Sequence, residues 1–153
     1  MGIKNRFFWI AALIAFLLDQ LTKHWVVQTF NLGQSLPLLS GIFHFTYVTN
    51  TGAAFSLLSD KVGWLRWLSL GVSLLLITIA LLGPLLNFWE QLGYGLILGG
   101  AMGNGIDRFT KGYVVDFLDF RLINFAVFNM ADSFISMGIV CLLIASWQKT
   151  PSN

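Results

Sequence analysis

Two aspartates in an apolar stretch near the C-terminal end have the clearest capacity for chemistry in this chain. Asp116 lies in "GYVVDFLDF" and Asp132 in "FNMADSFI", so apolar residues surround both carboxyl groups. In a strand register Asp116 shares a face with Val114 and Leu118, and burial there raises the pKa of a carboxyl group. Asp132 opens a helical stretch three residues after Asn129, which is typical of a helix cap, and the helix dipole favours a negative charge at that end.

This contrast between two environments is the arrangement through which paired carboxyl groups take acid and base roles. If the strand and the helix start converge, the ionised carboxylate takes a proton from water and the protonated partner donates to a carbonyl oxygen. This is the chemistry of an aspartic protease, which needs neither a metal nor a covalent intermediate. Taken alone, Asp132 is more simply a helix cap, and the sequence separation of Asp116 and Asp132 does not establish that they meet.

The elements that position these acids belong to an integral membrane protein. Of the 153 residues, 56% are hydrophobic and 10% are charged, whereas soluble domains carry about 25% charged residues. The length suits a single domain over residues 1–153. A net charge of +2 is too small and scattered to indicate nucleic acid binding. The single cysteine, Cys141, and two distant histidines predict neither a disulfide framework nor a zinc site.

Four apolar segments approach the roughly 20 residues that a transmembrane helix requires. We therefore predict an all-α membrane fold built on a four-helix bundle. The predicted spans cover approximately residues 7–27, 67–86, 92–109 and 131–147. Four spans place both termini on one side of the membrane, and Lys4, Arg6 and Lys149 favour the cytoplasm for that side. Other Lys and Arg residues lie in the opposite loops, so charge alone does not decide the orientation.

Two segments between the predicted spans have strand patterns. Residues 42–50 alternate aromatic and polar side chains, and residues 113–121 form a second candidate. Both connect spans on the same side of the membrane, so we expect the two to pair in a small sheet at the membrane surface. Asp119 and Arg121 are expected to pair with each other. The stretch 55–67, "FSLLSDKVGWLRW", mixes apolar, aromatic and basic residues, which predicts a short amphipathic segment lying in the interface as a lid.

Polar residues also lie inside the predicted spans, where they are costly and usually face the protein interior. Asp19 and Lys23 are four positions apart, which favours a structural ion pair on one helix face. Glycines in the third span recur every four residues and predict a close helix contact, at Gly95, Gly99 and Gly103. Asn104, Asp107 and Arg108 gather on the adjoining face. They form either a buried polar cluster or a clamp in which Arg108 donates to substrate carbonyls, and both can hold.

Two other classes of protein fit some of these residues. A channel or proton-coupled transporter would use Asp19, Asp107, Asp116 and Asp132 as relay groups, but it requires acids near the bilayer midplane, and these lie toward span ends. A structural membrane subunit would use the acids only as caps and ion-pair partners, and it would tolerate asparagine at both Asp116 and Asp132. A presenilin-type protease would contain a GxGD block, which the sequence lacks.

Five blocks of the chain resemble bacterial lipoprotein signal peptidases (signal peptidase II). The blocks occur in the family's order from the first predicted span to the fourth: "DQLTK" (19–23), "NTGAAFS" (50–56), "GGAMGNGIDR" (99–108), "GYVVDFLDF" (112–120) and "FNMADSFI" (128–135). The resemblance implies a four-span aspartic endopeptidase of the bacterial cytoplasmic membrane. Such an enzyme cuts the signal peptide from a prolipoprotein just before a diacylglyceryl-modified cysteine.

The resemblance also implies roles for individual residues. Asp116 and Asp132 match the catalytic pair. Four residues match polar positions that line the site or hold the peptide, namely Asn50, Asn104, Arg108 and Asn129. Two more match supporting acids, Asp19 and Asp107. We further expect both termini in the cytoplasm, an active site toward the extracytoplasmic face, and a monomer that uses no cofactor or metal and meets prolipoproteins and membrane lipid.

Overall fold

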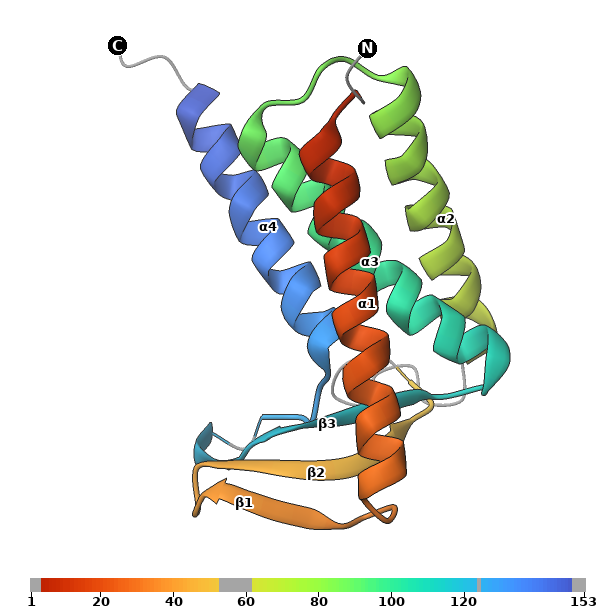
Figure 1. Ribbon diagram of the computed structural model, residues 1–153, viewed down its shortest axis with the longest axis vertical. Helices are drawn as coiled ribbons and strands as arrows, with labels where there is room; N and C mark the ends of the chain where they lie inside the picture. Colours follow the sequence, from red (N-terminus) through yellow and green to blue (C-terminus); the bar gives the residue numbers. More distant parts are fainter. Residues whose placement is uncertain (1–3, 53–61, 124, 150–153) are drawn as a thin grey trace.

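The computed structural model describes residues 4–52, 62–123 and 125–149. Its elements, in chain order, are α1 (Arg6–Thr29), β1 (Ser35–Leu39), β2 (Phe43–Asn50), α2 (Val62–Leu82), α3 (Phe88–Thr110), β3 (Val114–Phe120), the short 3-10 helix η2 (Arg121–Ile123) and α4 (Met130–Lys149). The helices run alongside one another, and the sheet lies across one end of the bundle (Figure 1). The start of α1, the end of α4 and the α2–α3 connection lie at the opposite end.

Each of the four predicted spans corresponds to a long helix. Within the described residues, three helical stretches are long and apolar enough to cross a membrane, at Arg6–Thr29, Gly63–Leu82 and Met130–Gln148. The central helix, α3, packs against the other three. It is 23 residues long but interrupted by glycine and polar residues, so a fourth crossing stays a prediction.

The second predicted span covers approximately 67–86, whereas the helix found there, α2, runs from Val62 to Leu82. The helix stops before Gly83 and Pro84, since a proline disfavours helical geometry in the residue before it. Near that end the side-chain amide of Asn5 donates to the carbonyl of Ala80 at 3.0 Å. Residues 62–67 of the predicted interfacial lid therefore form the first turns of α2, and residues 55–61 lie outside the described residues.

The predicted glycine stripe packs α3 against α1. A Cβ atom at Gly99 would lie 2.5 Å from the Ala12 carbonyl oxygen, and Gly95 faces the backbone of Phe8 in the same way. A second set of glycines, which we did not predict, brings α4 equally close. A Cβ atom at Gly100 would lie 2.5 Å from the Ala131 carbonyl oxygen. Small residues thus let α3 contact both neighbours backbone to backbone.

The sheet has three antiparallel strands in the order β1-β2-β3. The predicted pairing of the segments at 42–50 and 113–121 is confirmed, with Phe43 opposite Phe120 and Asn50 opposite Val114. We did not predict β1, because Pro37 interrupts it and every residue is exposed, so it has no alternation. Such a strand is tolerated at a sheet edge.

One face of the sheet packs against the end of α1. Val115 and Phe117 of β3 are buried there with Tyr47, Val26 and Phe30. Successive side chains of a strand point to opposite faces. The face of β3 that carries Asp116 is therefore turned away from this apolar cluster.

A substitution at the helix contact tests this packing. We expect Gly99→Ala to lower the free energy of unfolding by roughly 1–3 kcal/mol, because overpacking forces the two backbones apart. Gly71→Ala on α2 is the matched control, since a Cβ atom there has nothing within 4 Å. The measurement is unfolding in detergent followed by circular dichroism. Equal stability of the two variants would contradict the close α1–α3 contact.

Candidate functional site

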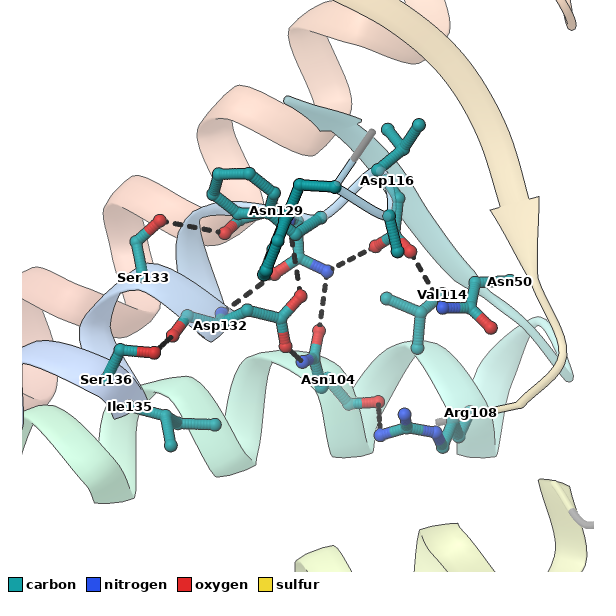
Figure 2. A pocket seen from close by; sticks show the side chains of 14 residues that line it. Asn50, Asn104, Arg108, Val114, Asp116, Asn129, Asp132, Ser133, Ile135 and Ser136 are labelled. Carbon is teal, nitrogen blue, oxygen red and sulfur yellow. Dashed lines mark hydrogen bonds between the residues drawn. The ribbon is translucent and has the colours of Figure 1, made fainter. Parts of the chain in front are cut away.

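A cavity of about 500 Å³ opens between α3, α4, β3 and the segment that precedes α4. It contains Asn50, Asn104, Arg108, Val114, Asp116, Phe125, Ala126, Val127, Phe128, Asn129, Asp132, Ser133, Ile135 and Ser136 in its lining. Six of the eight predicted site residues therefore meet at one place (Figure 2). The other two, Asp19 and Asp107, are buried in an adjacent ion cluster outside this lining.

Asp116 is held in the cavity wall by two amide groups. Its side chain is 2% exposed. Its Oδ1 atom accepts a hydrogen bond from Asn129 Nδ2 at 2.6 Å, and its Oδ2 atom accepts one from Asn50 Nδ2 at 2.8 Å. The Asn50 Oδ1 atom accepts from the backbone N–H of Gly52 at 2.8 Å, which sets the orientation of that amide.

The environment of Asp116 favours its protonated form. Burial is the main cause, and the negative charge of Asp132 adds to it, so that the pKa of Asp116 rises to about 6. The hydrogen bonds from Asn50 and Asn129 and the positive charge of Lys23 act in the opposite direction. The sequence analysis predicted the direction of this shift from the strand register.

Asp132 caps the start of α4 and also faces the cavity. Its Oδ2 atom accepts from the backbone N–H of Asn129 at 3.2 Å, and Asn129 Oδ1 accepts from the backbone N–H of Asp132 at 3.1 Å. This reciprocal cap confirms the predicted arrangement. The remaining oxygen, Oδ1, accepts from Asn104 Nδ2 at 2.9 Å. The cap therefore turns one carboxylate oxygen toward α3.

Two asparagines link the acids across the cavity (Figure 2). Asn129 Nδ2 donates both to Asp116 and, at 3.1 Å, to Asn104 Oδ1. Asn104 in turn donates to Asp132. The strand and the helix start therefore converge, as the aspartic protease interpretation requires.

Arg108 reaches the same cavity from α3. It donates to the carbonyl oxygens of Gly52 at 3.3 Å and Asn104 at 3.5 Å. Its Nε atom is buried and has no hydrogen-bond partner among the described residues. An unpartnered buried donor favours a ligand that brings an acceptor. Arg108 therefore belongs to the predicted polar cluster, and its role as a clamp for a substrate carbonyl stays a prediction.

Next to the cavity lies a buried ion cluster that joins α1 and α3. Lys23 is 1% exposed, and its ammonium group lies 2.8 Å from Asp19 and 3.0 Å from Asp107. The predicted Asp19–Lys23 pair is confirmed. Lys23 also donates to Asn104 Oδ1 at 2.8 Å, which connects the cluster to the site. Sequence reasoning did not predict that contact.

A further acid on β3 lies on the opposite face of the sheet. Asp119 pairs with Arg121 at 2.8 Å, as predicted, and accepts from Thr46 Oγ1 at 2.6 Å. It is not part of the cavity lining. Asp119 therefore serves as an internal comparison for Asp116, because both are buried acids of one strand.

This chain is similar over most of its length to known proteins of one family. The family described as signal peptidase (SPase) II matches residues 11–148. A lipoprotein signal peptidase of Nostoc sp. is 82% identical over all of this chain and 97% of its own length, and one of Cyanothece sp. is 64% identical over all of this chain and 90% of its own. A solved structure described as a bacterial membrane enzyme has a TM-score of 0.84 at 29% identity, and the match covers 94% of this chain and 92% of that one.

The amide contacts of Asp116 predict the effect of one substitution on its acidity. Asn50→Ala removes a donor that stabilises the carboxylate, so the pKa of Asp116 should rise further above about 6. Thr46→Val on the same strand is the control, because Thr46 donates to Asp119 instead. Carbon-13 NMR titration of the aspartate carboxyl groups in detergent measures both. A fall in the pKa of Asp116 in the Asn50 variant would contradict this assignment.

Proposed function

Because this chain belongs to the signal peptidase II family, we propose that it is a membrane aspartic endopeptidase that cleaves the signal peptide from diacylglyceryl-modified prolipoproteins just before the lipidated cysteine. Membership of the family implies a peptidase. The observation that carries the two-aspartate mechanism is that Asp116 and Asp132 line one cavity and are linked through two amides.

The surroundings of the two acids support different charge states. Asp116 holds the proton below about pH 6, because burial raises its pKa to about 6. Asp132 carries the negative charge at the first turn of α4, where its two oxygens accept N–H donors from Asn104 and Asn129. In this mechanism the pair holds one proton between its two carboxyl groups.

The reaction then follows general acid and base catalysis. Asp132 takes a proton from a water molecule as the water oxygen bonds to the scissile carbonyl carbon, and Asp116 donates its proton to the carbonyl oxygen. The resulting tetrahedral diol collapses when Asp132 gives its proton to the amide nitrogen and the carbon–nitrogen bond breaks. Asp116 recovers a proton from the diol hydroxyl as the new carboxylic acid forms. Each acid has then returned to its starting state.

The cavity suits an extended peptide that carries a lipid. Its volume of about 500 Å³ lies within the range of roughly 300–1,000 Å³ that is usual for ligand sites. One part of the lining is apolar, with Phe125, Val127, Phe128 and Ile135. Arg108 Nε and the side-chain amides provide partners for a backbone that is no longer in a helix. Acyl chains anchor the modified cysteine by about 0.8 kcal/mol per buried methylene, which holds the scissile bond near the headgroups.

The arrangement of the bundle supports a membrane orientation for the site. The cavity is lined by residues of α3, β3 and the first turns of α4. These parts meet at the sheet end of the bundle, away from the start of α1 and the end of α4 (Figure 1). We place the sheet and the cavity on the extracytoplasmic face of the bacterial cytoplasmic membrane and both termini in the cytoplasm, with α3 as the fourth crossing. The enzyme acts as a monomer on prolipoproteins in the lipid. A transmembrane proton path is disfavoured, because the acids gather at one end of the bundle.

Replacing either acid tests the catalytic pair. We expect Asp116→Asn and Asp132→Asn each to lower kcat by at least about 1,000-fold, because each removes an acid–base group. Asp119→Asn is the matched control and should cut at nearly the wild-type rate, since Asp119 pairs with Arg121 on the other face of the sheet. The assay follows cleavage of a diacylglyceryl-modified prolipoprotein by purified protein in lipid, with circular dichroism as a check of folding. A folded variant of either acid that cuts at the wild-type rate would refute the mechanism.

The pKa of Asp116 predicts the pH dependence of cleavage. Asp116 must hold its proton to act as the acid, and a carboxyl group with a raised pKa loses that proton only as the pH rises through the raised value. We therefore expect kcat/KM to fall above about pH 6, by about tenfold per pH unit. Initial rates across a pH series measure this. A rate that stays constant from pH 6 to 8 would contradict a protonated Asp116.

A further inference from the structure

Lys23 connects the buried ion cluster to the amide network of the site. Its ammonium group has three protons and no acceptor atom. Three oxygens lie within hydrogen-bond distance: Asp19 Oδ2 at 2.8 Å, Asp107 Oδ2 at 3.0 Å and Asn104 Oδ1 at 2.8 Å. The ammonium group donates to Asn104 and pairs with both carboxylates, although Asp107 Oδ2 accepts no hydrogen bond among the described residues. Two partners balance its charge, and the third is neutral and belongs to the site.

The contact with Lys23 determines the orientation of the Asn104 amide. Because an ammonium group cannot accept a hydrogen bond, Asn104 must present its oxygen to Lys23 and its nitrogen to Asp132. The oxygen also accepts from Asn129 Nδ2, whose own oxygen accepts from the backbone N–H of Asp132. Each hydrogen bond from Lys23 through Asn104 and Asn129 to Asp132 therefore has only one possible direction.

At the end of this network, all four carboxylate oxygens of the acid pair accept an N–H group. The Asp116 oxygens accept from Asn129 and Asn50, and the Asp132 oxygens accept from Asn104 and from the backbone of Asn129. The shared proton must therefore occupy a lone pair that no amide uses.

We propose that Lys23 is a positioning residue of the aspartate pair, which fixes the Asn104 amide so that N–H groups face both acids and the shared proton stays available for the substrate. This role rests on the proposed function, and Lys23 acts through Asn104 without touching the substrate. If the amide turned over, Asn104 would present its oxygen to the Asp132 carboxylate and its nitrogen to the nitrogen of Asn129. Repulsion of both pairs would loosen the site.

The positive charge of Lys23 also acts on Asp116 directly. The charged groups that act on Asp116 come from three helices: Asp132 from α4, Lys23 from α1 and Arg108 from α3. Lys23 lowers the pKa of Asp116. Its removal should therefore keep Asp116 protonated to a higher pH.

The test uses a charge-balanced pair of substitutions. Lys23→Met alone leaves the buried Asp19 carboxylate without its cation, so it is combined with Asp19→Asn. Asp107 keeps its bridge to Lys111 at 2.9 Å. Asn at position 19 can still accept from the backbone N–H of Ala131, which Asp19 contacts at 2.9 Å. The reference is Asp19→Asn alone, which retains the contact of Lys23 with Asn104.

Lys111→Met is the matched control. Lys111 binds the same carboxylate as Lys23, but its side chain is 38% exposed and it reaches Asp107 from outside. If Lys23 acted only by balancing the charge of Asp107, the two lysine variants would change the pH profile alike.

Relative to Asp19→Asn, we expect Lys23→Met with Asp19→Asn to lower kcat about 100-fold with little change in KM, as a misplaced catalytic group does. The descending limb of kcat/KM should move to higher pH. Lys111→Met should have the wild-type kcat and the wild-type pH profile of kcat/KM. A folded double variant with unchanged kcat and limb would overturn the proposal, as would an equal shift of the limb in Lys111→Met.

Carbon-13 NMR titration of Asp116 separates this proposal from the proposed function. If the wild-type protein fails to cut the lipidated substrate, the proposed function fails, while an upward shift of the pKa of Asp116 in the double variant alone still supports coupling through Lys23. If cleavage depends on Asp116 and Asp132 and this pKa is the same in the double variant and Asp19→Asn, the proposed function stands and the role of Lys23 fails.

Discussion

A carboxylate inside this bundle must be surrounded by donors, and that constraint organises the end of the molecule that carries the site. Desolvation of an unpaired charge costs several kcal/mol even after the protein relaxes. Asp19, Asp107 and Asp116 are each almost completely buried. The first two share the ammonium group of Lys23, and the third receives amides from Asn50 and Asn129. Because the donors come from α1, α3, β2 and the start of α4, the acids can be buried only when these elements are assembled.

The glycines of α3 supply the proximity that this arrangement needs. A polar network works over 2.6–3.2 Å between heavy atoms, so the helices that contribute to it must approach more closely than larger side chains allow. Gly103 lies directly against the Asp19 carboxylate, and Gly100 against the carbonyl of Ala131 at the first turn of α4. The small residues of the bundle are therefore needed for the polar network, because the close approach of the backbones keeps the acids within hydrogen-bond distance of their donors.

The sequence predicted those features that depend on local patterns. Hydropathy located four helices, alternation located β2 and β3, and helical spacing placed Asn104, Asp107 and Arg108 on one face. β1 was missed because Pro37 and full exposure leave it no alternation, and the end of α2 was misplaced because hydropathy continues past Gly83. The contact of Lys23 with Asn104 joins residues 81 positions apart. No periodicity relates such a pair, so only the packing of α1 on α3 reveals it.

The spacing of Asp19 and Lys23 along one helix has a consequence for biogenesis. During synthesis α1 enters the membrane long before α3, which supplies Asp107 and Asn104, has left the ribosome. An acid and a base four residues apart pair within the helix itself, so α1 has no net charge at this position while it waits in the bilayer. When α3 later packs against α1, its glycine face docks beside the pair and completes the cluster. Asp19 and Lys23 thus enter the membrane as a neutral pair, and α1 forms its part of the ion cluster before α3 completes it.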